Sequence, residues 1–138
     1  MKKTLAIFIL VGSSLIGLSK INAQTASSGT LTANPQNVTA FTNENGAGNT
    51  KLSWSTANSP RTLITLTKTR KNGSLLAAET VVINNNAATG SRDINYIQKD
   101  VIHTFKLFTA TGTSNTDYVK GALLATYIVN GYDPVARE

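Results

Sequence analysis

Apolar and polar side chains alternate along most of the chain beyond residue 30. The period of two is clearest in Val101–Thr109, where His103, Phe105 and Leu107 fall on one face of an extended backbone. Such alternation is typical of half-buried β-strands, and we find no stretch beyond residue 23 with the three-and-four-apart apolar spacing of an amphipathic helix. The pattern therefore predicts an all-β domain.

Seven strands are expected in about 100 residues, separated by turns rich in Asn, Gly, Ser and Pro. They cover Thr30–Ala33 with a continuation at Asn37–Ala40 after Pro35, Lys51–Thr56, Arg61–Thr69, Leu75–Ile83, Ser91–Ile94, Val101–Thr109 and Tyr118–Val129. This number of short strands predicts a single antiparallel β-sandwich. The side chains expected to meet between its two sheets are Leu52, Trp54, Ile64, Leu66, Phe105 and Leu107.

One turn has a strong local signal. Asn72-Gly73 lies between two strand-like runs, and this dipeptide readily adopts the positive φ angles of a two-residue hairpin turn. We therefore expect Leu75–Ile83 to return antiparallel to Thr62–Thr69.

The N-terminal segment reads as a secretory leader. Two lysines precede an apolar stretch, Leu5–Leu18, which at about 14 residues is shorter than the roughly 20 that a spanning helix needs. Ala23 then offers a small residue for cleavage before Gln24. The expected organisation is a signal peptide at 1–23, a flexible tail at 24–29, the sandwich at 30–130 and a C-terminal tail at 131–138. An uncleaved membrane anchor is the alternative; no later segment is apolar enough to span a membrane.

Charge and cysteine content narrow the functional classes. Three of the 13 basic residues lie in the leader, so ten basic and seven acidic residues remain and the net charge falls from +6 to +3. This excess is too small to favour a nucleic-acid partner. The chain has no Cys, which excludes disulfides and thiol catalysis, so an exported domain would depend on its core alone.

The order of landmarks resembles bacterial fibronectin type III-like and immunoglobulin-like modules. Trp54 stands on the second expected strand after Leu52, and Ile97 is followed six residues later by His103. In the family a Tyr at that place ties down the corner before a central strand; here His103 would do so by donating a hydrogen bond to a backbone carbonyl. The resemblance covers Thr30–Val129 and implies a sandwich, but the family has no common activity.

Catalytic and metal-binding patterns are sparse. His103 is the single His and has no Ser in a nucleophile-elbow context, so we interpret it as structural. One His without Cys does not supply the usual zinc ligands. The acidic residues are scattered over turns and strand ends, and no glycine-rich phosphate loop opens a helix. We therefore expect no enzyme activity, no metal and no cofactor, although a fold-assembled carboxylate pair remains the least favoured alternative.

Two surface features are the candidate binding sites. The first is basic and consists of Lys68, Arg70 and Lys71 at the end of a strand, with Lys106 nearby; it would suit an anionic glycan or a partner, or only protect a sheet edge. The second is a threonine-rich outer face flanked by Phe108 and Tyr127, which would suit sugar stacking or a protein interface.

The expected function follows from these features. We expect an exported interaction or surface-assembly module that is not an enzyme and that binds a protein or an extracellular glycan. A carbohydrate-binding module that uses an outer sheet face is the alternative. The destination could be the periplasm, the cell surface or the medium.

Overall fold

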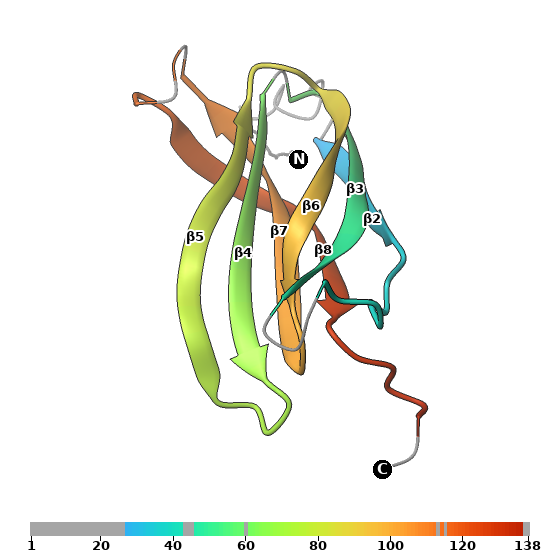
Figure 1. Ribbon diagram of the computed structural model, residues 1–138. Helices are drawn as coiled ribbons and strands as arrows, with labels where there is room; N and C mark the ends of the chain where they lie inside the picture. Colours follow the sequence, from blue (N-terminus) through green and yellow to red (C-terminus); the bar gives the residue numbers. More distant parts are fainter. Residues whose placement is uncertain (1–26, 43–45, 60, 113, 115, 137–138) are drawn as a thin grey trace, which may run out of the picture.

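Two antiparallel sheets face each other in the computed structural model of the protein (Figure 1). The first sheet has the strand order β2-β3-β6, with β2 at Ser28–Asn34, β3 at Ala47–Ala57 and β6 at Thr89–Gln98. The second has the order β5-β4-β7-β8, with β5 at Leu75–Asn85, β4 at Thr62–Arg70, β7 at Val101–Thr111 and β8 at Val119–Asn130. The predicted all-β sandwich is thereby confirmed.

The structure describes residues 27–42, 46–59, 61–112, 114 and 116–136. The predicted leader and its cleavage site lie outside these residues, and export stays a prediction. The predicted tail at 24–29 overlaps the first strand, because β2 already begins at Ser28.

The core lies between the sheets and is made by the inward side chains of both. Burial alternates along β3, where Leu52 and Trp54 are 0% and 5% exposed. All six predicted core residues belong to the main buried cluster, together with Leu31, Ala33, Val38, Ile83, Ile94, Ile97 and Val129. The period of two was a sufficient guide for these six residues because they lie on β3, β4 and β7, whose inward faces are covered along most of their length.

A smaller buried cluster lies on the outer face of the four-stranded sheet. Leu63, Phe108 and Ala110 form it, and Tyr118 packs over them from the segment just before β8. A sheet face that would otherwise be open to water is thus partly covered.

The hairpin between β4 and β5 has a three-residue loop, and the predicted two-residue turn is wrong. Arg70 and Ser74 close the loop, since the Arg70 N–H donates to the Ser74 carbonyl at 2.8 Å, and only Gly73 within it has positive φ, at 91°. This arrangement is typical of a type I turn followed by a glycine bulge. The predicted antiparallel pairing of the two strands is confirmed.

β6 is much longer than predicted, and the predicted continuation of the first strand at Asn37–Ala40 is wrong, because only an isolated bridge at Asn37 forms there. β6 covers ten residues, of which only Ile94 and Ile97 are buried, so the rest of this edge strand looks like a loop in the sequence. After Pro35 the chain crosses to the other sheet, where the Val38 N–H donates to the Asn130 carbonyl at 2.8 Å. The segment around Asn37 therefore covers the end of β8.

Candidate functional site

The four predicted basic residues do not form one patch. Lys68 and Arg70 share the inward side of β4 near its end, whereas Lys106 lies on the outer face of β7, opposite Thr65 in the register. Lys106 is therefore on the other side of the sheet from Lys68, and the predicted patch that included both is wrong.

The three basic residues at the end of β4 have separate local partners. Lys68 Nζ donates to Gln98 Oε1 at 2.8 Å, across to the opposite sheet. Arg70 donates to the Leu75 carbonyl at 3.2 Å and stays within its hairpin. Lys71 lies 3.9 Å from the carboxylate of Asp100 and 4.5 Å from the centre of the Tyr132 ring.

The two aromatic residues predicted to flank the outer face lie on opposite faces. Phe108 is on the outer face but only 8% exposed, and Lys120 Nζ lies 4.5 Å from the centre of its ring. Tyr127 pairs with inward-facing Phe105 and packs against the core, where its hydroxyl reaches the Ala33 carbonyl at 3.4 Å. The predicted pair of exposed aromatic rings is therefore wrong.

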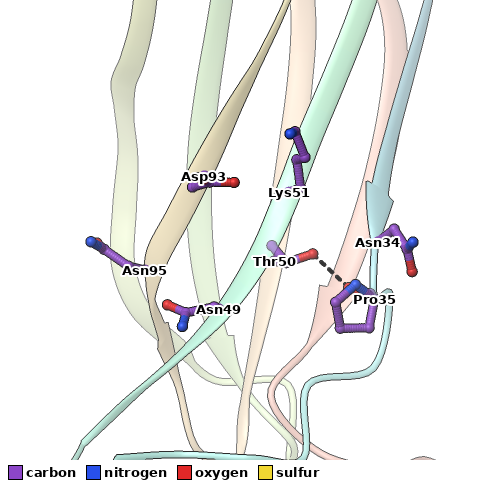
Figure 2. A pocket seen from close by; sticks show the side chains of 7 residues that line it. All are labelled: Asn34, Pro35, Asn49, Thr50, Lys51, Asp93 and Asn95. Carbon is purple, nitrogen blue, oxygen red and sulfur yellow. Dashed lines mark hydrogen bonds between the residues drawn. The ribbon is translucent and has the colours of Figure 1, made fainter.

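A polar hollow of about 480 Å³ opens on the outer side of the three-stranded sheet (Figure 2). It lies where β2 ends and where β3 and β6 continue. Its lining residues are Asn34, Pro35, Asn49, Thr50, Lys51, Asp93 and Asn95. None of them was singled out from the sequence, because three strands contribute only one to three polar side chains each.

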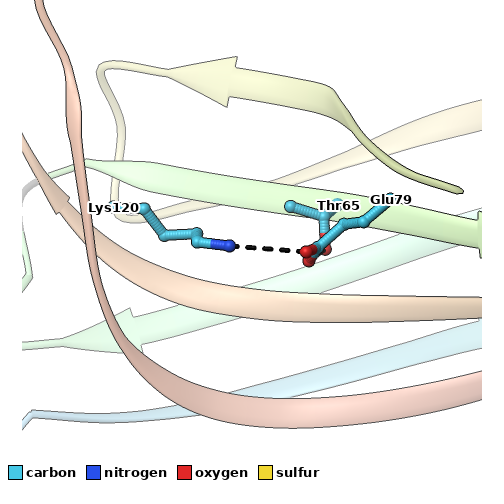
Figure 3. Close-up of polar contacts among 3 residues, drawn as sticks. All are labelled: Thr65, Glu79 and Lys120. Carbon is cyan, nitrogen blue, oxygen red and sulfur yellow. Dashed lines mark hydrogen bonds and ion pairs between the residues drawn. The ribbon is translucent and has the colours of Figure 1, made fainter.

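A smaller hollow of about 200 Å³ lies on the outer face of the four-stranded sheet. At its floor the hydroxyl of Thr65, which is 1% exposed, donates to Glu79 Oε2 at 2.6 Å (Figure 3). Lys120 Nζ reaches the other carboxylate oxygen at 3.4 Å. The Thr65 hydrogen bond lowers the pKa of Glu79; burial opposes this effect, while Lys120 and Lys106 add to it.

Tyr118 and Val81 border this hollow and also a second one beside it. The second hollow has a volume of about 400 Å³ and is lined in addition by Val82, Asn84 and Arg92. Val81 and Tyr118 are the two residues that line both hollows, while Glu79 lines only the first and Arg92 only the second. We call Val81 and Tyr118 the outer ridge.

Buried Arg61 holds the loop that ends in Tyr118. The Arg61 side chain is 2% exposed and donates to Asn84 Oδ1 at 2.8 Å and to the carbonyls of Ser114 and Gly112 at 3.1 and 3.5 Å. From the sequence alone, an arginine that follows a proline at the start of a strand is expected to be exposed to solvent. Only the fold brings Arg61 beneath the loop, so this role was missed.

His103 is fully buried at the corner between β6 and β7. Its Nε2 accepts a hydrogen bond from the Gln98 N–H at 3.1 Å, and Nδ1 has no described partner with hydrogen-bond geometry. The predicted donation to a carbonyl is therefore replaced by acceptance from an N–H. The pKa of His103 is lowered to about 4, mainly by burial and also by the charge of Lys68, while the carbonyls of Val101 and Val129 act in the opposite direction.

Within the part of the chain that the structure describes, no three His, Asp or Glu side chains gather as a metal site. Across those residues there is also no helix of the length and apolarity needed to cross a membrane.

Comparisons with protein-family models, with curated proteins and with solved structures give no match to this chain.

Proposed function

We propose that this chain is an exported interaction module with a fibronectin type III-like fold, which is not an enzyme and which binds a protein partner at the outer ridge. Two sheets of three and four antiparallel strands support the family assignment. The corner hydrogen bond supports it further, because His103 is tied to backbone five residues upstream, as the family's tyrosine is.

The composition of the outer ridge is the observation that carries the proposal. Tyr118 and 40%-exposed Val81 supply an apolar centre, and Glu79 and Arg92 supply opposite charges on its two sides. Protein interfaces combine such an apolar, aromatic centre with a charged rim. A partner segment with an apolar side chain for this centre and an acidic group for Arg92 would match it, since the carboxylate of Glu79 already has Thr65 and Lys120 as partners.

The chemistry of Glu79 favours binding over catalysis. Both of its carboxylate oxygens have partners and its pKa is lowered, so it is poorly suited to act as a general acid. Sugar stacking on this face has little support, because Phe108 is covered and Tyr127 points inward.

The test begins with capture of partners from the native cell envelope by the tagged exported protein. A captured protein is then purified and titrated against wild type, Tyr118→Ser and Tyr96→Ser. We expect Tyr118→Ser to weaken binding at least tenfold, which is about 1.4 kcal/mol. Tyr96, a 37%-exposed tyrosine on the other sheet, is the matched control and should be neutral. Equal affinity of all three proteins would refute the outer ridge as the docking site.

A further inference from the structure

We propose that the polar hollow between β2, β3 and β6 is a second binding site, which takes the end of a neutral, polyhydroxylated glycan. It lies on the three-stranded sheet (Figure 2), whereas the outer ridge lies on the four-stranded sheet. The proposal goes beyond the protein-docking function and does not depend on it.

The hollow is built by two irregularities of the sheet. β2 ends at Asn34, opposite Lys51, whereas β3 extends four residues further at that end and keeps only β6 as a neighbour. The pairing of β3 with β6 shifts between Gly48 and Thr50, and such bulges re-aim side chains and occur often beside binding sites.

One wall of the hollow is firmly held. Thr50 is 3% exposed, and its hydroxyl donates to the Pro35 carbonyl at 2.6 Å. This bond connects β3 to the segment that leaves β2, so the two sides of the hollow are held together without using the groups that face it.

The polar side chains that face the hollow do not bind one another. No described residue forms a hydrogen bond or ion pair with these side chains, which are those of Asn34, Asn49, Lys51, Asp93 and Asn95. The carboxylate of Glu79 on the other sheet, in contrast, is taken by Thr65 and Lys120. The polar hollow therefore has hydrogen-bonding capacity available for a ligand.

The chemistry of these groups selects a neutral polyol. Each Asn amide offers both a donor and an acceptor, as each sugar hydroxyl does. Lys51 and Asp93 are direct neighbours in the register, so their charges offset each other and favour neither an anion nor a cation. The lining has no aromatic ring and only Pro35 as an apolar residue, which disfavours a protein hot spot. The volume lies in the usual range for small ligands, about 300–1,000 Å³.

The test is a titration of the ¹⁵N-labelled exported protein, followed by amide chemical shifts. The probes are maltotriose, cellotriose, mannotriose and chitotriose. We expect at least one to shift the amides around Asn34, Lys51 and Asp93 in a saturable manner. The double variant Asn49→Ala/Asn95→Ala should weaken binding at least tenfold, and Asn86→Ala, an exposed Asn in the turn after β5, should leave it unchanged.

Three outcomes of the titrations with wild type and the double variant would overturn the proposal. They are the absence of saturable shifts with all four probes, shifts that map to another surface, and binding that the double variant retains in full. Tyr118→Ser separates the two proposals, because it should leave sugar binding intact while it impairs protein docking. Loss of sugar binding in Tyr118→Ser would place the sugar at the outer ridge and refute the second site.

Discussion

At the scale of single residues, His103 makes the stability of the folded sandwich depend on pH. Its ring is fully buried, accepts the Gln98 N–H and has a pKa of about 4. A free imidazole has a pKa of about 6.5, so between these values the unfolded chain binds a proton that the folded protein does not bind. Proton binding therefore favours the unfolded chain, so the free energy of unfolding decreases as the pH falls below about 6.5.

The first prediction is therefore a loss of stability in mild acid. The free energy of unfolding should fall by about 3 kcal/mol as the pH decreases from 6.5 to about 4, beyond the change due to carboxylates. Urea unfolding at several pH values measures it. His103→Tyr is the control, since a phenol does not titrate in this range; an equally steep loss in that variant would show that His103 is not the cause.

The second prediction concerns the corner itself. His103→Tyr should be neutral or stabilising at pH 7, because the phenol oxygen can accept the Gln98 N–H. His103→Ala should cost about 2 kcal/mol, because it leaves that N–H without its partner. Denaturant unfolding of the three proteins gives the values. A folded His103→Tyr protein that no longer binds its partner would contradict the structural role.

At the scale of elements, close contact between neighbouring strands decides which residues are tolerated. Trp54 on β3 pairs with Gly90 on β6, and a Cβ added at Gly90 would lie 2.7 Å from Cζ2 of the indole. The glycine thus allows the large ring to lie flat against the adjacent strand in a region where interiors are closely packed.

The third prediction tests this contact. Gly90→Ala should destabilise the protein by about 1–3 kcal/mol through overpacking, and Trp54→Ala by about 3–5 kcal/mol. In a Trp54→Leu background the cost of Gly90→Ala should largely disappear, because the clashing ring atoms are gone. Additive costs in this double-mutant cycle would mean that the two residues do not interact.

The fourth prediction concerns the pairing of β4 with β5. Thr65→Val removes the hydroxyl that donates to Glu79, so the pKa of Glu79 should rise toward its ordinary value. Carboxyl chemical shifts across a pH titration measure it. Thr67→Val, two residues along the same face of β4, is the matched control; an unchanged Glu79 pKa in Thr65→Val would show that the neighbouring lysines and not Thr65 lower it.

At the scale of the whole molecule, the sandwich presents two different outer faces. The four-stranded sheet carries the outer ridge, held by Arg61 beneath its loop, and the three-stranded sheet carries the polar hollow. Because the two faces are separated by the core, binding on one need not disturb binding on the other. This arrangement suits a module that connects a protein to a glycan surface.

The fifth prediction concerns the first residue of the mature protein. The exported protein should begin at Gln24, because Ala23 ends an otherwise typical leader. Intact-mass measurement of protein from the periplasm and the medium identifies the first residue. A membrane-bound species that retains residues 1–23 would contradict cleavage and favour the anchor.

The sequence by itself determined the all-β class, the position of most strands and the inward residues of the core. Alternation reports which face is covered wherever one side of a strand meets a core, and Leu52, Trp54 and Phe105 all follow it. The ends of β6 were missed because an edge strand that carries few buried residues has no such signal.

Only the tertiary structure decided the candidate sites. The pairing of β7 with β8 shifts register near Phe108, and a shift of one residue reverses which side chains face outward. Tyr118 covers Phe108 because Arg61 holds the intervening loop. The polar hollow needs residues from three strands and a bulge between two of them. Such features depend on contacts between residues distant in the chain, whereas a hydrophobic pattern carries information only about near neighbours.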